Sequence, residues 1–330
     1  MTLFLHTGFK KKGAEHRLIS QIACIFIAMF DYIRNAMSHT EDRYISLLTD
    51  FGFKRIFGTA PNKDLLIDFL NSLFDGEQVV TDVTYLNSEK IGDISIERKA
   101  IFDVYCENEK GEKFIVEMQN AFQQFFKDRS LYYSTFAIRE QAPKGMNWDF
   151  SLSHVYVVAL INFNMHEESF YPDDINHDVG LLDKKTHKVF NDKLTFKYVE
   201  ISKFTKTEDE LETPFDKWLF ILRNLSRLDS QPAALKEKVF TKLFKESEIA
   251  KFNKVELHEY EDSVKVYRDL KNSLDTALRQ GREEGLAEGL AEGLKKADAK
   301  IKAIAHSMLE KGMSKEMIAE LTGLSIDEIQ

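Results

Sequence analysis

The residues best suited to chemistry are two carboxylates and an amide: Asp103, Glu117 and Gln119. If Asp103 and Glu117 face each other on paired strands, their Cβ atoms lie about 5 Å apart and their negative charges repel. A divalent cation between them removes that repulsion, and carboxylate oxygens are the ligands that hard cations prefer. The pair therefore predicts a metal site, with Gln119 beside it.

The elements around these residues form a predicted β-hairpin. Its strands are residues 101–106 and 114–118, and its polar turn is centred near Lys110 and Gly111. A turn centred at Lys110 pairs Asp103 with Glu117, and strand alternation then places Gln119 on the face of Glu117. A shift of one residue in register would move Asp103 to the other face of the hairpin.

The same polar residues also fit the solvated face of an ordinary antiparallel sheet. Ile101 and Ile115 share the faces of the two carboxylates, so the surroundings are partly apolar. This apolar setting favours the metal site over the solvated face.

Helices and strands alternate around the hairpin. Apolar residues at helical spacing predict helices over residues 62–74 and 122–141. Strands are predicted at residues 81–85, 100–106, 114–118, 154–163 and 194–201. The run 154–163 is almost wholly apolar, which is typical of a strand buried on both faces. This order predicts an α/β or α+β domain over residues 37–204.

The chain then becomes helical. Residues 205–280 form a predicted helical region, with Pro214 at a plausible helix start. Within residues 281–300, glycine recurs at every fourth position from Gly281 to Gly293. Each glycine costs a helix about 1 kcal/mol relative to alanine. The segment is therefore either a frayed spacer or a helix that packs against a partner, as in a homo-oligomer formed through the C-terminal helices.

The last predicted unit, residues 301–330, is a small helical hairpin. Ser314 and Ser325 occupy N-cap positions, and Gly312 and Gly323 stand where helices end. The order of these signals is that of a helix-turn-helix. It favours either oligomerisation or DNA recognition.

Composition limits the possible classes of protein. The chain of 330 residues is 43% hydrophobic, which is ample for a large core. A formal net charge of -9 disfavours tight nonspecific binding to DNA without a metal. The two cysteines, Cys24 and Cys106, show neither metal-binding nor disulfide spacing, which indicates a reducing cytoplasm.

The N-terminal residues 1–36 are predicted to be an extension that precedes the native start at Met37. Their apolar run from Leu18 to Ile33 resembles a signal peptide or an anchor, but polar residues interrupt it. It is also shorter than the roughly 20 residues that span a bilayer, so a role in the membrane is disfavoured. An amphipathic helix on a membrane surface is the alternative.

A family resemblance rests on several motifs in a fixed order. They are TDFGFKRIFG, NKDLLIDFLNSLF, Asp103 with VEMQN, the helix containing Arg129, Tyr132 and Tyr133, Asn147-Trp148, DKWLFIL and the glycine-rich tail. In this order, over residues 40–330, the chain resembles the Rpn-type recombination-promoting nuclease and transposase family. That family is a branch of the PD-(D/E)xK nuclease superfamily.

The resemblance implies a restriction-endonuclease-like core, in which helices flank a central mixed sheet, followed by an all-helical C-terminal region. It implies an endonuclease that hydrolyses DNA in recombination or transposition, uses Mg²⁺ or Mn²⁺ and needs no small-molecule cofactor. Asp103 and Glu117 would bind the metal. Gln119, where the superfamily usually has lysine, would orient the attacking water. Lys54 or Arg129 would contact the phosphate.

The rival interpretation is a catalytically degenerate transposase relative that binds DNA or a protein partner. The low basicity of the chain and the missing motif lysine favour this interpretation. The intact pair Asp103 and Glu117 opposes it.

Overall fold

The computed structural model describes residues 42–87, 89–90, 100–142, 149–165, 167 and 169–329. The chain divides into two compact units, of which the first ends at Tyr267 and the second begins at Arg268. The extension predicted at residues 1–36 lies outside the described residues. Within the described part of the chain, no helix combines the length and the apolar character needed to cross a membrane.

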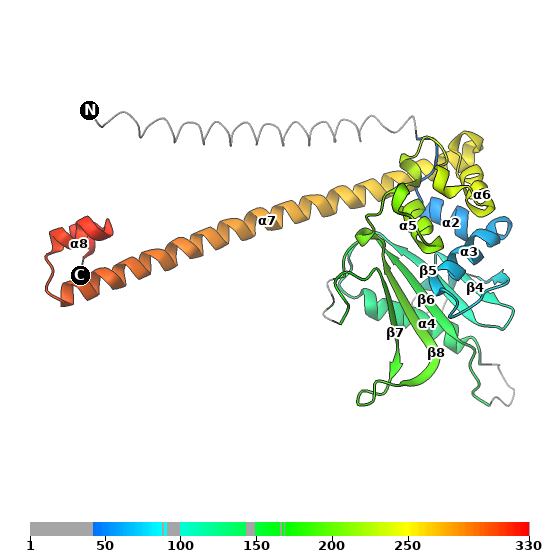
Figure 1. The fold of residues 1–330 in the computed structure, drawn as a ribbon, viewed down its shortest axis with the longest axis horizontal. Coiled ribbons are helices and arrows are strands. Elements are labelled where there is room, and N and C mark those ends of the chain that lie inside the picture. Colours follow the sequence, from blue (N-terminus) through cyan, green and yellow to red (C-terminus); the bar gives the residue numbers. More distant parts are fainter. Residues whose placement is uncertain are drawn as a thin grey trace. The chain divides into compact units, whose positions relative to one another are not determined.

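A six-stranded mixed sheet forms the centre of the first unit, with the strand order β1-β4-β5-β6-β8-β7 (Figure 1). Its strands are β1 (Val83–Tyr85), β4 (Val104–Asn108), β5 (Lys113–Gln119), β6 (Val155–Ile161), β7 (Asn176–Leu182) and β8 (Val189–Glu200). The pairs β5–β6 and β6–β8 are parallel, and the other pairs are antiparallel. A separate ladder joins β2 (Glu89–Lys90) to β3 (Ala100–Ile101). The predicted central mixed sheet is therefore confirmed.

Helices cover both faces of this sheet (Figure 1). One face packs against α2 (Asp50–Phe57), α3 (Lys63–Phe74), α5 (Pro214–Asn224) and α6 (Lys238–Glu246). The other face packs against α4 (Phe126–Arg139). Short 3₁₀ helices lie at Ala60–Asn62, Ile201–Lys203, Glu208–Glu210, Leu225–Arg227, Ala233–Leu235, Ile249–Lys251 and Ile326–Glu328.

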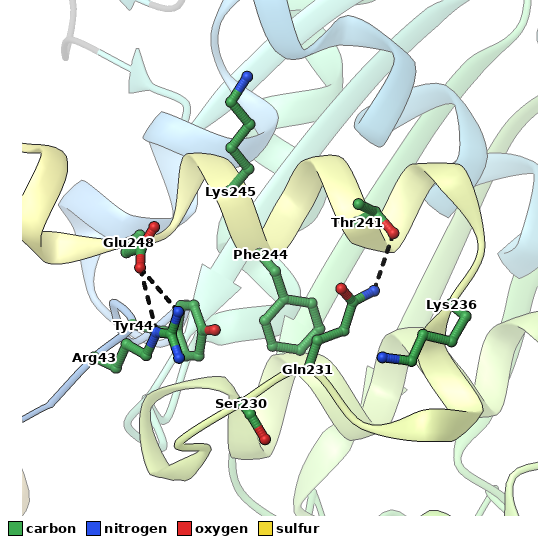
Figure 2. A pocket seen from close by; sticks show the side chains of 9 residues that line it. All are labelled: Arg43, Tyr44, Ser230, Gln231, Lys236, Thr241, Phe244, Lys245 and Glu248. Atoms are coloured by element: carbon green, nitrogen blue, oxygen red, sulfur yellow. Dashed lines mark hydrogen bonds and ion pairs between the residues drawn. The ribbon is translucent and has the colours of Figure 1, made fainter.

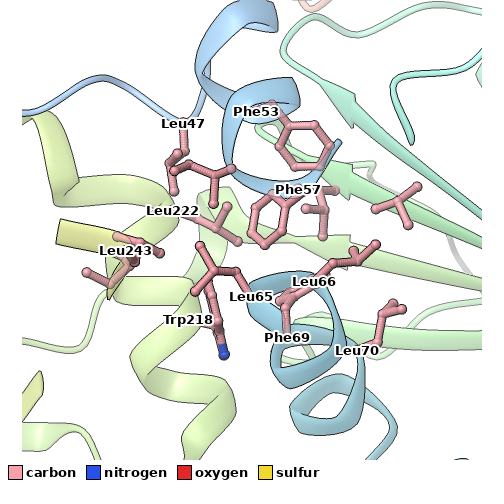
Figure 3. Close-up of a cluster of buried hydrophobic side chains, with 14 of the residues drawn as sticks. Leu47, Phe53, Phe57, Leu65, Leu66, Phe69, Leu70, Trp218, Leu222 and Leu243 are labelled. Atoms are coloured by element: carbon pink, nitrogen blue, oxygen red, sulfur yellow. The ribbon is translucent and has the colours of Figure 1, made fainter. Parts of the chain in front are cut away.

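Strand alternation divides the core into two apolar clusters. Val104 and Val116 point into the cluster shared with α2, α3, α5 and α6, whereas Tyr105 and Ile115 point toward α4. The larger cluster contains Trp218 of α5, which is fully buried among aromatic and leucine side chains (Figure 3). Helices from beyond residue 204 thus share one core with the sheet.

The β4–β5 hairpin has the register that its sequence predicts. Val104 pairs with Val116, and Glu107 pairs with Lys113. Gly111 closes the loop with a φ of 73°, a conformation that favours glycine. The Asn108 Oδ1 atom accepts hydrogen bonds from the Lys110 and Glu112 backbone N–H groups, each at 3.0 Å. Turn chemistry therefore sets the register that carries Asp103 toward Glu117.

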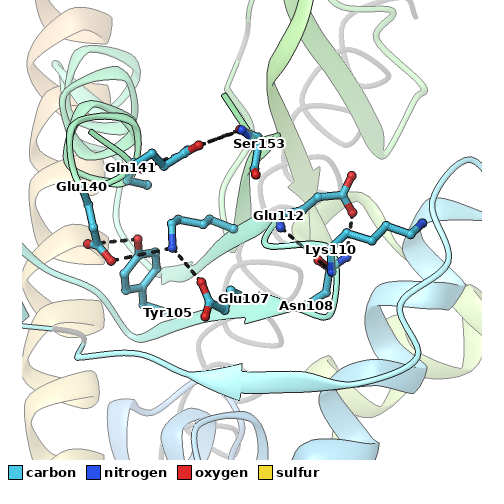
Figure 4. Close-up of polar contacts among 10 residues, drawn as sticks. Tyr105, Glu107, Asn108, Lys110, Glu112, Glu140, Gln141 and Ser153 are labelled. Carbon is cyan, nitrogen blue, oxygen red and sulfur yellow. Dashed lines mark hydrogen bonds and ion pairs between the residues drawn. The ribbon is translucent and has the colours of Figure 1, made fainter. Parts of the chain in front are cut away.

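A polar network ties the turn end of the hairpin to the end of α4 (Figure 4). The buried Lys113 Nζ lies 2.9 Å from Glu107 Oε2 and 3.7 Å from Glu140 Oε1. The Tyr105 hydroxyl donates to Glu140 Oε2 at 3.3 Å. Because Glu140 directly follows α4, the network fixes this helix against the hairpin.

Two strand predictions need correction. The strand predicted over residues 100–106 is broken, since Phe102 and Asp103 lie between β3 and β4. Phe102 is fully buried, with its ring centroid 5.2 Å from that of Tyr105, so the chain bends to fill the core there. Strand β7 was not predicted, because most of its residues are exposed on the sheet edge and show no apolar alternation.

Helix α7 (Lys254–Glu310) begins in the first unit and continues into the second. It is helical through the whole glycine repeat, so residues 281–300 are part of one 57-residue helix. Apart from the adjacent residues and the backbone of the same helical turns, no described atom lies within 4 Å of the position that a Cβ atom would take on Gly281, Gly285, Gly289 or Gly293. The repeat therefore has room for larger side chains within one chain.

Replacing Gly285 and Gly289 by alanine is expected to stabilise this helical segment by about 1 kcal/mol per site, because alanine restricts the unfolded chain more than glycine does. Thermal unfolding followed by circular dichroism measures the change. Gel filtration of the same variant tests the homo-oligomer. Dissociation to a smaller species would show that a second copy packs against the glycines, contrary to this expectation.

The C-terminal helices form a small core of their own. Helix α8 (Lys315–Thr322) begins after Ser314, whose side chain accepts from the Met317 N–H, and ends at Gly323, which has a φ of 73°. The backbone of Gly312 also adopts the left-handed conformation, with a φ of 83°. Ile318 is fully buried against the end of α7. The predicted caps and helix ends are confirmed.

Candidate active site

Asp103 lies at the open end of the hairpin, next to the strand that carries Glu117. Its Oδ2 atom accepts a hydrogen bond from the Met118 backbone N–H at 2.8 Å. Its Oδ1 atom lies 4.0 Å from Lys54 Nζ of α2. The structure thus brings Asp103 to the residue adjacent to Glu117, as the register requires.

Glu117 is a buried carboxylate, with 9% of its side chain exposed. Its Oε2 atom lies 3.9 Å from Arg129 Nη2 of α4. Its Oε1 atom is buried and has no hydrogen-bond partner among the residues that the structure describes. A buried acceptor without a partner is costly, so this oxygen is available to a ligand.

The two carboxylates disfavour each other's charge. Burial, followed by the negative charge of Asp103, raises the pKa of Glu117 to about 8. Arg129, the Asp103 backbone N–H and Lys54 oppose this rise without cancelling it. Burial is also the largest cause of a raised pKa at Asp103. Without a cation between them, this pair is therefore electrostatically unfavourable at neutral pH.

Gln119 and Arg129 form a second contact at the same end of β5. Arg129 Nη2 donates to Gln119 Oε1 at 2.8 Å, and Arg129 Nη1 donates to Gln123 Oε1 at 2.6 Å. The other end of the Gln119 amide is also engaged, since its Nε2 donates to the Ala121 carbonyl at 2.9 Å. All five predicted site residues, Lys54 included, therefore meet at one end of the sheet.

The two cations reach the acids from opposite layers. Lys54 belongs to α2, on one face of the sheet, and Arg129 belongs to α4, on the other. Lys54 also forms an ion pair at 2.6 Å with the exposed Asp50 in the first turn of α2. Asp103 thus lies where both helical layers meet the end of the sheet.

The start of α2 is anchored to the end of β5. Asn120 Nδ2 donates to the Leu48 carbonyl at 2.7 Å, just before Thr49 caps the helix by accepting from the Gly52 N–H. A Cβ atom on Gly52 would stand 2.1 Å from the Ser46 carbonyl oxygen, so only glycine fits there. This turn positions the helix that carries Lys54.

Sequence reasoning missed Asn120 and Gln123 as parts of the site. Asn120 directly follows Gln119, and this adjacency is the signal that could have identified it. Gln123 carries no comparable signal, because its role depends on α4 returning along the sheet.

The donor set suits a hard divalent cation. Asp103 and Glu117 offer only oxygen ligands, and Glu117 Oε1 lacks any other partner in the described part of the chain. Within that part, no three acidic, histidine or cysteine side chains cluster as a metal site. Two carboxylates still fit Mg²⁺, which keeps several of its own waters when bound to protein. Asp103 and Glu117 are therefore the residues that would hold it.

A hollow with a volume of about 340 Å³ lies elsewhere in the first unit (Figure 2). Arg43, Lys236 and Lys245 line it together with Glu248, whose carboxylate pairs with Arg43 at 3.1 Å. None of the acids or cations of the site lines this hollow. The acid pair, and not this hollow, is therefore the candidate active site.

Comparison with known proteins agrees with this fold. Residues 47–277 match the model of the PD-(D/E)XK nuclease family transposases. Residues 299–330 match the C-terminal HTH domain of the Rpn/YhgA-like nuclease family. No curated protein and no solved structure matches the chain. The mixed sheet with flanking helices is the restriction-endonuclease-like fold, and the chain belongs to the PD-(D/E)XK nuclease family of transposases, within its Rpn branch.

Proposed function

We propose that this protein is a metal-dependent DNA endonuclease in which Asp103 and Glu117 bind Mg²⁺, or Mn²⁺ in its place. The family supports a nuclease with a DNA-binding role. The observation that carries the metal assignment is the buried Glu117 Oε1, which has no partner among the described residues and lies in a carboxylate pair with Asp103.

The residues of the chain prepare the site for phosphodiester hydrolysis. The Met118 N–H fixes one oxygen of Asp103, so the other oxygen remains free to bind a cation. Lys54 lies near that free oxygen and reduces the negative charge around it. When bound here, Mg²⁺ would lower the pKa of a water molecule and neutralise charge on the phosphate.

The proposed substrate is DNA, cut during recombination or transposition in the cytoplasm. The C-terminal helix-turn-helix supports DNA binding by a part of the chain outside the nuclease unit. With a net charge of -9, the chain lacks a general electrostatic attraction to phosphates. Binding through a dedicated domain compensates for this, because it raises the local concentration of DNA at the nuclease unit.

A plasmid-nicking assay tests the proposed function. The protein should nick supercoiled plasmid with Mg²⁺ or Mn²⁺, and Asp103→Asn should lose at least about a hundredfold in rate. Loss of a residue that only supports a metal ligand already costs about 10–100-fold. Asp128→Asn removes an exposed carboxylate of α4 and should cut at the original rate.

Two results would contradict the proposal. The first is no cleavage with either metal, which would favour the degenerate relative that only binds DNA or a protein partner. The second is equal cleavage by Asp103→Asn, which would place the chemistry elsewhere. Gel-shift binding of the same DNA by all three proteins separates loss of binding from loss of cleavage.

A further inference from the structure

Both ends of the Gln119 amide are already hydrogen-bonded within the protein. Its Oε1 atom accepts from Arg129 Nη2 at 2.8 Å, and its Nε2 atom donates to the Ala121 carbonyl at 2.9 Å. The residue is only 7% exposed. Turning the amide toward a water would break two hydrogen bonds in a buried place, which is costly. The side chain of Gln119 instead connects β5, the strand that carries Glu117, to the guanidinium group of Arg129.

The Arg129 guanidinium is held by hydrogen bonds, but it forms no hydrogen-bonded ion pair with Glu117. Within the described part of the chain, it donates hydrogen bonds to two neutral amide oxygens, those of Gln119 and Gln123. Its Cζ atom lies 5.6 Å from the ring centre of Phe126 and 5.4 Å from that of Tyr133. The distance of 3.9 Å to Glu117 Oε2 exceeds a hydrogen bond. The positive charge therefore remains available beside the acid pair.

Lys54 is the less suitable of the two cations. Its Nζ atom already forms an ion pair at 2.6 Å with Asp50, whereas it lies 4.0 Å from Asp103. Arg129, in contrast, is 30% exposed and presents a planar fork of donors. Such a fork matches the oxygens of a phosphate group, which a single ammonium does not.

Charge balance indicates why the site needs this group. The two carboxylates of Asp103 and Glu117 together cancel the charge of one divalent cation. The phosphodiester then brings its own negative charge, and attack at phosphorus adds another. Positive charge from outside the acid pair is therefore required at the phosphate, and Arg129 is the cation held in place for it.

We propose that Arg129 is a catalytic residue that stabilises the negative charge developing on the phosphate, and that Gln119 is the positioning residue that holds its guanidinium. This inference rests on the proposed nuclease function. It assigns the required cation to α4 and changes the expected role of Gln119 from orienting water to orienting Arg129.

The test compares cleavage by Arg129→Ala, Gln119→Ala and the double variant, with Arg139→Ala as the control that removes a guanidinium from the exposed end of α4. Arg129→Ala should lower kcat about 100–1,000-fold with little change in KM, the usual loss for one donor at a developing charge. Gln119→Ala should lower kcat about tenfold. The double variant should be no slower than Arg129→Ala, because Gln119 acts only through the guanidinium.

A rescue variant separates catalysis from support of the fold. Gln119→Lys in the Arg129→Ala background places an ammonium near the space left by the guanidinium and should recover at least tenfold in kcat. Arg129→Gln keeps a polar side chain without the charge. When both variants are folded, it should be as slow as Arg129→Ala. Melting temperatures of all variants, with and without Mg²⁺, identify those that are folded and still bind the ion.

The outcomes distinguish this inference from the proposed function. If the original protein does not cleave with Mg²⁺ or Mn²⁺, both are overturned. If it cleaves and folded Arg129→Ala or Arg129→Gln keeps its kcat, only the role of Arg129 is overturned. Losses that multiply in the double variant would overturn the positioning role of Gln119. No recovery with the lysine would overturn the role of the positive charge at Arg129.

Discussion

Glu117→Gln is expected to stabilise the metal-free protein at alkaline pH while it abolishes metal-dependent cleavage. The folded-state pKa of Glu117 is about 8, above its ordinary value of 4.5. The stability that protonated Glu117 contributes is fully present below pH 4.5, and it is lost as the pH rises through about 8. Glutamine stays neutral at every pH, so the variant avoids this loss, which is on the order of 5 kcal/mol.

Urea denaturation in the presence of a chelator measures this effect. The unfolding free energies of the variant and the original protein should be similar at pH 4 and should diverge toward pH 9, with the variant the more stable. Glu259→Gln is the matched control, because it changes an exposed glutamate of α7 and should leave the pH dependence unaltered. If Glu117→Gln is no more stable than the original protein at pH 9, the pKa of Glu117 is not raised in the folded state.

The response to Mg²⁺ gives an independent readout. Ligand binding to the folded state raises its stability, so Mg²⁺ should raise the melting temperature of the original protein. It should have little effect on Glu117→Gln, which has lost one of the two charged ligands. Equal stabilisation of both proteins would place the ion at another site. We expect Asp103 and Glu117 to lower the stability of the metal-free protein, because the site is built to bind a cation.

Trp218→Ala is expected to cost about 3–5 kcal/mol of unfolding free energy in the first unit, as is typical for a large aromatic side chain removed from a core. Trp218 is fully buried, and its ring centre lies 5.6 Å from that of Phe57 and 5.1 Å from that of Phe240. Domains are stable by only about 5–15 kcal/mol, so the variant should be near the limit of folding. Urea titration followed by circular dichroism measures the loss.

Trp218→Phe separates packing from hydrogen bonding. The indole Nε1 donates to Asp68 Oδ1 at 2.7 Å, and burial raises the pKa of that carboxyl group. Phenylalanine keeps most of the apolar contact but leaves Asp68 without this donor, which should cost about 1–3 kcal/mol. Phe190→Ala, at an aromatic residue that is 82% exposed, should change stability by less than about 0.5 kcal/mol. A loss at Phe190 as large as that at Trp218 would contradict this account of the core.

Elements whose signals are local were predictable. The hairpin register follows from the alternation of β4 and β5 and from the left-handed Gly111. The end of α8 follows from Ser314 and Gly323 in the same way. Such signals need only a few consecutive residues, because caps and turns are set by the backbone and its nearest side chains. The bend at Phe102 was not predicted, because it depends on packing against core residues distant in sequence and has no local signal.

The sequence by itself determined that Asp103 and Glu117 would meet, because turn chemistry and a period of two set the pairing of a hairpin. Only the tertiary structure decided how those acids behave. The burial of Glu117 depends on α4 closing over the sheet, and so does the contact that brings Arg129 to Gln119. Both depend on the packing of elements separated along the chain, and desolvation and charge respond to that packing rather than to local pattern.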